Sequence, residues 1–297
     1  MSTVFPLRLD LPTVSRSNSG VALPHSGAGP ALEEPLIIDA HSHVHDPVES
    51  HLAALNDAGV DRAVLFGTRP HPERAGDLVS LRREMSVLDN ALAGGENSID
   101  RYRTAWAELH ETLAAHPSRF IGFGSVPVDL PARDIAALID REVVGRGLRG
   151  IGELTPPAGE AARIEPVLAA AHDHSGLPVV VHGFAPTTAQ DLRTLSRLAA
   201  QYPKVPLVVS QLGGMNWMEA IELVRDTPSM YLELSTATII FAVRLAIHEI
   251  PERTLFGSDA PYGDPVLART AIERVTPPGE VRDLVLGGNL GKLLGIL

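Results

Sequence analysis

The chain of 297 residues contains no cysteine, and this absence limits the chemistry that it can carry. Without thiols it can form neither disulfide bonds nor thiolate metal sites. Any bound metal would be held by imidazole and carboxylate groups, which suit zinc, iron, manganese or nickel. Aromatic residues make up only 4% of the sequence, whereas hydrophobic residues make up 44%. The chain can therefore bury a large core, built mainly from aliphatic side chains.

Basic residues are also scarce, because 25 Lys and Arg stand against 36 Asp and Glu, for a net charge of -11. This balance argues against nucleic acid as a partner and against an anionic membrane surface, since both require basic patches. No apolar run approaches the roughly 20 residues of a membrane span. The N-terminal sequence lacks the basic and apolar blocks of a secretory signal. We therefore expect a cytoplasmic protein that acts on a small molecule.

From Leu36 onward, short apolar runs alternate with segments of helical period. Continuous apolar runs are typical of strands that are covered on both faces in a parallel sheet. The eight runs span residues 36–40, 63–67, 120–126, 150–154, 178–182, 206–211, 230–235 and 254–259. Eight strands that alternate with helices predict an α/β fold, a (β/α)8 TIM barrel. The rival is an open doubly wound sheet, but no GxGxxG turn follows the first run.

Two segments depart from this alternation. Residues 1–34 are rich in Pro, Ser and Gly, and we expect an N-terminal arm that is partly disordered or packed on a surface. Residues 68–119 form a longer connection with two helical patterns, around 76–92 and 98–115. We interpret it as a helical insertion after the second strand that could cover the barrel mouth. The expected organisation is an arm, 1–34, followed by one barrel domain, 35–297, which could pair as a homodimer.

Polar residues stand where the predicted strands end, and in such barrels the active site forms at the carboxyl ends of the strands. His41 and His43 follow the first run, and residues two apart on an extended chain point to the same side. His182 ends the fifth run and Asp259 the eighth. Three histidines and one carboxylate would hold a metal ion and leave an open position for water. The alternatives are core histidines held by hydrogen bonds and an Asp259 that caps a helix.

Further polar residues stand at other strand ends, and the remaining histidines lie in helical or loop patterns. The other strand-end residues are Glu153, Gln211, Glu233, Ser235 and Thr236. We expect the other histidines at the surface, with His45 as the exception because it is close to the pair. These are His51, His71, His110, His116, His172, His174 and His248.

Six motifs together resemble the amidohydrolase superfamily of metal-dependent TIM-barrel hydrolases. They are IIDAHSHVH (37–45), HPSRFIGFGSVP (116–127), GIGEL (150–154), LPVVVH (177–182), LFGSDAPYGDP (255–265) and LVLGGNLGKLLGI (284–296). In order and spacing they are most similar to the branch that contains aminocarboxymuconate-semialdehyde decarboxylase and the resorcylate-type decarboxylases. The resemblance covers about residues 36–297.

The resemblance implies that His41, His43, His182 and Asp259 are the metal ligands, and that Asp259 also shuttles protons. Glu153 matches a position that supplies a carboxylate ligand in some relatives; the alternative is that it orients a ligand histidine. One residue departs from the pattern. Relatives usually carry a histidine at the end of the sixth strand, where this chain has Gln211, which cannot shuttle a proton. We therefore expect one divalent ion, zinc first, with manganese, iron and nickel as alternatives.

Three functions are compatible with these residues. The first is hydrolysis of an amide, ester or lactone carbonyl by metal-activated water, with Asp259 moving the proton and Gln211 donating to the oxyanion. The second is metal-dependent decarboxylation of a small carboxylic acid, for which Arg69 and Arg149 are the nearest cations that could hold the substrate carboxylate. The third is a degenerate barrel that binds a ligand without chemistry, or a metal-free lactonase.

Overall fold

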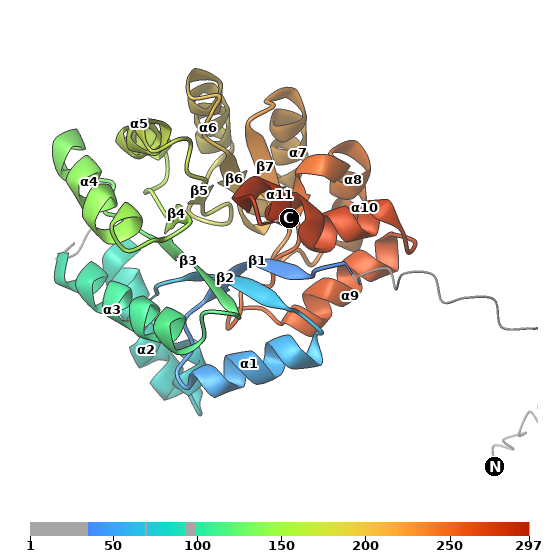
Figure 1. Ribbon diagram of the computed structural model, residues 1–297, viewed down its shortest axis with the longest axis horizontal. Helices are drawn as coiled ribbons and strands as arrows, with labels where there is room; N and C mark the ends of the chain where they lie inside the picture. The colour runs from blue at the N-terminus through green and yellow to red at the C-terminus, as the bar shows by residue number, and fades with distance from the viewer. Residues whose placement is uncertain (1–34, 69, 93–98, 297) are drawn as a thin grey trace, which may run out of the picture. The chain divides into compact units, whose positions relative to one another are not determined.

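The computed structural model describes residues 35–68, 70–92 and 99–296, and within them eight parallel strands lie inside a ring of helices (Figure 1). The strands are β1 (Ile38–His43), β2 (Arg62–Phe66), β3 (Phe120–Gly124), β4 (Gly150–Leu154), β5 (Val179–Val181), β6 (Leu207–Val209), β7 (Met230–Glu233) and β8 (Thr254–Leu255). Each pairs with the next in sequence order. The eight predicted strands are all present.

The last strand returns to the first and closes the barrel. The backbone N–H of Ala40 donates to the carbonyl of Phe256 over 2.8 Å, and the N–H of Asp259 donates to the carbonyl of His41 over 2.7 Å. A parallel bridge joins Ser42 to Ala260 at the same seam. The predicted (β/α)8 barrel is therefore confirmed. The closure also brings the segment after β8 against the histidines of β1.

Both faces of the strands are buried, which explains why the apolar runs are continuous. In β5, Val179 and Val181 pack in the outer layer between strands and helices, whereas Val180 packs inside the barrel. Phe66 and Phe123 also belong to the inner cluster and meet edge to face, with ring centroids 5.8 Å apart. Because successive side chains on a strand point to opposite faces, a strand covered on both faces is apolar at consecutive positions, as β5 is.

Helices surround the strands and link each one to the next (Figure 1). Thr188 and Asp191 form a reciprocal capping box at the start of α6, and Asp264 caps α9. Both caps satisfy backbone N–H groups that a helix start leaves unpaired. The helices are α1 (Val48–Asp57), α2 (Leu78–Leu92), α3 (Ile99–Ala115), α4 (Ala132–Leu138), α5 (Glu165–Asp173), α6 (Ala189–Gln201), α7 (Trp217–Asp226), α8 (Ile240–Glu249), α9 (Pro265–Val275), α10 (Glu280–Asp283) and α11 (Asn289–Leu294).

The connection between β2 and β3 contains the two helices that the sequence predicts, α2 and α3. Helix α3 contacts β3 and buries Trp106 and Leu109, so it takes the ordinary place of a barrel helix. Only the part before it is extra: a 3-10 turn at Pro72–Arg74 followed by α2. The insertion is therefore shorter than the predicted range 68–119. Its action as a lid stays a prediction.

The predicted arm, residues 1–34, lies outside the described residues. Within the described part of the chain, no helix combines the length and the apolar character that a membrane span requires.

Candidate metal centre and active site

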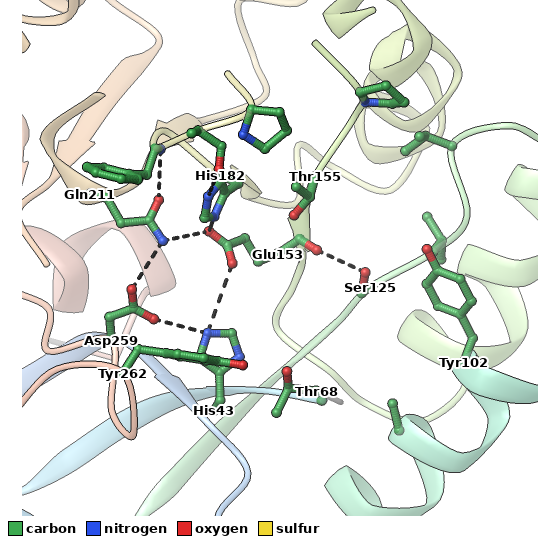
Figure 2. A pocket seen from close by; sticks show the side chains of 18 of the residues that line it. His43, Thr68, Tyr102, Ser125, Glu153, Thr155, His182, Gln211, Asp259 and Tyr262 are labelled. Atoms are coloured by element: carbon green, nitrogen blue, oxygen red, sulfur yellow. Dashed lines mark hydrogen bonds and ion pairs between the residues drawn. The ribbon is translucent and has the colours of Figure 1, made fainter. Parts of the chain in front are cut away.

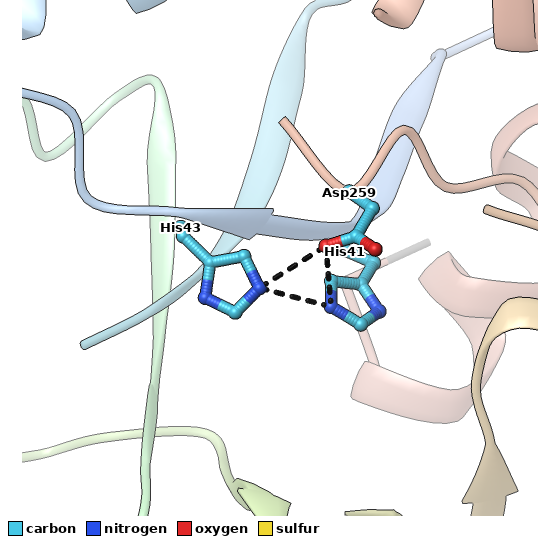
Figure 3. A group of neighbouring side chains, drawn as sticks. All are labelled: His41, His43 and Asp259. Atoms are coloured by element: carbon cyan, nitrogen blue, oxygen red, sulfur yellow. Dashed lines mark hydrogen bonds and ion pairs between the residues drawn. The ribbon is translucent and has the colours of Figure 1, made fainter. Parts of the chain in front are cut away.

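Three of the predicted ligands meet at the carboxyl end of the barrel (Figure 3). The Nε2 atoms of His41 and His43 lie 3.3 Å apart. Oδ1 of Asp259 lies 3.4 Å from the first and 3.2 Å from the second. All three side chains are buried. Two imidazole nitrogens and one carboxylate oxygen thus face a common point, as ligands of a single cation would.

Backbone geometry explains this convergence. His41 and His43 alternate with Ser42 along β1, so both imidazoles leave the same side of the strand, while the Ser42 hydroxyl donates to the carbonyl of Val64. Asp259 has a φ of 58°, a left-handed conformation that aspartate tolerates better than most residues. This turn directs its side chain back to β1. The capping alternative for Asp259 is wrong, because α9 is capped by Asp264.

The contacts of these residues fit a cation between them. Nδ1 of His41 lies 3.1 Å from Oε2 of Glu233, so Nδ1–H donates there and Nε2 is left with its lone pair toward the site. Oδ1 of Asp259 is buried and accepts no hydrogen bond. A buried carboxylate oxygen without a partner is costly unless a charge or donor compensates it. A metal ion at this point would satisfy it.

The carboxylates also give the site a strong preference for positive charge. Burial lowers the pKa of His41, but Glu153, Asp259 and Glu233 outweigh burial and raise it to about 10. Burial raises the pKa of Asp259, but His41 and His43 outweigh burial and lower it below its usual value. Asp259 is therefore ionised at neutral pH. The protein needs a cation here, either a proton on His41 or a metal ion.

Glu153, from β4, lies next to these three residues. Its Oε2 is 3.7 Å from Nε2 of His41 and 4.0 Å from Nε2 of His43. Its Oε1 lies 3.0 Å from Nδ1 of His182 and accepts a hydrogen bond from the Ser210 hydroxyl over 3.1 Å. Burial raises the pKa of Glu153, but His182 and His41 outweigh it and lower the pKa. Glu153 thus presents one oxygen to the site and uses the other as an anchor.

His182 follows β5, as predicted, but its ring nitrogens are directed elsewhere. Nδ1 faces Glu153, and Nε2 lies 3.1 Å from the carbonyl oxygen of Ala185. Both neighbours are acceptors, which suits a protonated imidazole, and Glu153 outweighs the effect of burial to raise the pKa of His182. The structure therefore places His182 beside the three converging ligands and not among them.

Gln211 is buried behind the carboxylates (Figure 2). Its Nε2 donates to Oε1 of Glu153 over 3.2 Å and to Oδ2 of Asp259 over 3.3 Å. Its Oε1 accepts from the backbone N–H of Gly183 over 2.9 Å. Both amide hydrogens are engaged with carboxylates, so the expected donation to a substrate oxyanion is not the arrangement found.

A cavity of about 900 Å³ opens above these residues (Figure 2). His43, Glu153, Gln211 and Asp259 form part of its wall. A cavity of this size admits a drug-sized molecule. Other lining residues come from the β2–α3 connection, from α3 and from the segments after β4, β5 and β8; they include Thr68, Tyr102, Trp106, Arg163, Phe184 and Tyr262.

The sequence model of the amidohydrolase family matches residues 38–296. The chain belongs to the amidohydrolase family. No curated protein matches it.

Several solved structures share the barrel of this amidohydrolase. The 5-carboxyvanillate decarboxylase from Sphingomonas paucimobilis is 18% identical, with a TM-score of 0.63 over 88% of this chain and 99% of that chain. A dihydroxybenzoic acid decarboxylase from Polaromonas, with bound manganese and the inhibitor 2-nitroresorcinol, is 17% identical, with a TM-score of 0.60 over 88% and 97%. A protein from Acinetobacter baumannii, described as a probable 2-pyrone-4,6-dicarboxylic acid hydrolase, is 15% identical, with a TM-score of 0.53 over 87% and 99%.

Of the two cations expected near the site, only Arg149 lies within the described residues, and it is not at the site. Arg69 lies outside the described residues. Arg149 precedes β4 and donates to the carbonyl of Leu294 in the last helix, so it is at the opposite end of the barrel from the site. Arg163 instead lines the cavity and pairs with Glu160. Arg163 could not be recognised from the sequence, because it stands at the start of a helical segment, where a surface role is usual.

Three histidines expected at the surface, or near it, are buried: His45, His51 and His71. The rings of His45 and His51 lie 4.0 Å apart, and none of their four nitrogens has a hydrogen-bond partner. Burial lowers the pKa of His45 to about 4 and that of His51 to about 2. A helical pattern indicates which face of a helix is polar, but a histidine can lie on either face. His51 is buried because its face of α1 packs on the barrel, whereas His71 precedes the 3-10 turn after β2 and contacts Glu73 and Glu108.

Proposed function

We propose that this amidohydrolase hydrolyses an amide, ester or lactone carbonyl of a small molecule in a metal-dependent reaction. The observation that carries the proposal is the position and ionisation of the Asp259 carboxylate. This carboxylate is ionised at neutral pH, its Oδ1 has no hydrogen-bond donor, and it lies at the wall of the cavity between the two imidazoles. A carboxylate in this position can accept a proton from water and pass it to a leaving group.

A divalent ion fits the residues present. His41, His43 and Asp259 would hold it, and Oε2 of Glu153 is the next nearest donor. His182 would join them only by leaving the Ala185 carbonyl. When bound, such an ion lowers the pKa of water and polarises a carbonyl group. Two imidazoles with one or two carboxylates suit zinc, manganese or iron.

Side chains of the protein would transfer the protons and hold the other groups of the site in position. The Asp259 carboxylate would accept the proton of the attacking water and return it to the leaving atom. Gln211 holds Oδ2 of Asp259, and Glu233 holds the ring of His41. Tyr262 lines the cavity beside His43, and burial raises its pKa to about 12, so its hydroxyl keeps a proton at neutral pH. It can donate a hydrogen bond to a substrate oxygen.

Decarboxylation is the second candidate, and two observations favour it. Two of the similar solved structures described above are decarboxylases, and one of these holds manganese. Arg163 could also receive a substrate carboxylate. Hydrolysis remains the better supported function, because Arg163 is the one arginine or lysine among the described lining residues and already pairs with Glu160.

The test combines metal analysis with two substrate panels. Purified protein is assayed for bound metal, for hydrolysis of esters, amides and lactones, and for carbon dioxide release from hydroxybenzoates. Asp259→Asn should abolish turnover, whereas Asp264→Asn, in the same loop, should retain it because asparagine also caps a helix. A folded protein that binds no metal and hydrolyses nothing refutes the proposal. Carbon dioxide release without hydrolysis would replace the proposed hydrolysis with decarboxylation.

A further inference from the structure

Gln211 contacts three buried carboxylates at once. Its side-chain Nε2 lies 3.2 Å from Glu153 and 3.3 Å from Asp259, and its backbone N–H donates to Oε2 of Glu233 over 3.2 Å. The residue holds a φ of 51° to make these contacts. Left-handed conformations of residues other than glycine cost free energy and concentrate at functional sites. The strained backbone and the three contacts indicate that this position organises the carboxylates.

The hydrogen-bond donors and acceptors around Gln211 allow only one orientation of its side-chain amide. Its Oε1 accepts from the N–H groups of Gly183, at 2.9 Å, and Phe184, at 3.4 Å. Its Nε2 faces carboxylate oxygens on the other side. The opposite orientation would set an oxygen against two carboxylates and an NH2 group against two N–H donors. The hydrogen-bond network thus fixes the amide, as it must where the two atoms are otherwise indistinguishable.

The carboxylate of Asp259 depends on the hydrogen bond from Gln211 more than the carboxylate of Glu153 does. Oε1 of Glu153 also has His182 and Ser210 as partners. Oδ2 of Asp259 has Gln211 as its one side-chain donor among the described residues. Holding Oδ2 leaves Oδ1 alone toward the imidazoles of His41 and His43. Without that bond, Asp259 could turn and offer both oxygens to the same point.

We propose that Gln211 is a positioning residue that holds Asp259 and Glu153 so that each presents one oxygen to the bound cation. The inference rests on the proposed metal site but not on hydrolysis. It gives a reason for glutamine at a position where the resemblance led us to expect histidine. A neutral imidazole carries one N–H and can hold only one carboxylate, and glutamate has no N–H at all. Glutamine carries two donors on one atom and can hold both.

The test compares cobalt binding by the wild-type protein and by Gln211→Met, which has similar length but no donor. Loss of a residue that orients a metal ligand typically lowers metal affinity 10–100-fold. We expect that loss, measured by competition with a chelator. We also expect weaker visible absorption of the bound cobalt, because a second Asp259 oxygen raises the coordination number. Gln211→His, with one donor, should lie between the two proteins in affinity.

Asn289→Leu is the matched control. Asn289 is also a buried side-chain amide whose nitrogen donates twice, but to the carbonyls of Pro251 and Thr254 near the start of β8. Its loss should lower thermal stability and leave the cobalt affinity and spectrum unchanged. Wild-type affinity and spectrum in Gln211→Met would overturn the proposal, as would unchanged values in Gln211→His if the methionine variant does not fold. Failure of the wild-type protein to bind cobalt or manganese would overturn the metal site itself.

Discussion

The affinity of this amidohydrolase for a divalent ion should rise steeply with pH. Three carboxylates outweigh burial and raise the pKa of His41 to about 10. Below that value the metal-free protein keeps a proton on the imidazole, and the ion must displace it. The free energy of binding therefore improves by about 1.4 kcal/mol for each pH unit, and affinity increases roughly 100-fold between pH 7 and pH 9. A histidine at its ordinary pKa of 6.5 would already be neutral over this range.

Calorimetric titration with manganese at pH 7, 8 and 9 measures this dependence directly. Repeating each titration in buffers of different ionisation heats counts the protons released, and we expect about one for each ion bound. His248→Ala is the control, since His248 is 80% exposed and distant from the site in the fold. That variant should show the same slope as the wild type. A constant affinity from pH 7 to pH 9, with no proton released, would refute the electrostatic account of the site.

Three further predictions follow from single side chains. In Gly257→Ala the new Cβ would lie 2.1 Å from Oε1 of Glu233, so Glu233 must move; we expect a loss of about 1–3 kcal/mol of unfolding free energy, and an unchanged denaturant midpoint would contradict this. His51 is neutral when folded, since burial lowers its pKa to about 2, whereas the unfolded chain binds a proton below about 6.5. His51 alone should therefore lower the unfolding free energy by about 1.4 kcal/mol per pH unit on acidification, so that His51→Leu should lose stability less steeply between pH 6.5 and pH 4; equal slopes would count against it. Arg163→Met should raise the KM of ester substrates that carry a second, anionic group and leave neutral esters unaffected, and an equal effect on both would exclude Arg163 as their contact.

Much of the fold could be predicted because its signals are local. The eight apolar runs correspond to β1–β8, since strands buried on both faces need apolar residues at consecutive positions. The size of the insertion was overestimated. A helical pattern does not tell whether a helix such as α3 packs in the ordinary layer or outside it.

The candidate site could be predicted in part. His41, His43 and Asp259 were found from their places at strand ends, because a parallel barrel brings those ends together. The orientation of His182 toward Glu153 and Ala185 could not be found in this way. The position of a residue at a strand end fixes where its backbone lies. Whether the residue binds a metal depends on the direction in which its side chain points.

The sequence by itself determined the barrel, the end at which its polar residues gather and the absence of thiolate chemistry. These properties depend on hydrophobic period, strand order and residue type. Only the tertiary structure decided that Glu153 faces the imidazoles, that Gln211 joins two carboxylates and that His45 and His51 are buried. Each of these results depends on contacts between segments far apart in the chain, and their side-chain directions are set by packing and by hydrogen bonds that no local pattern records.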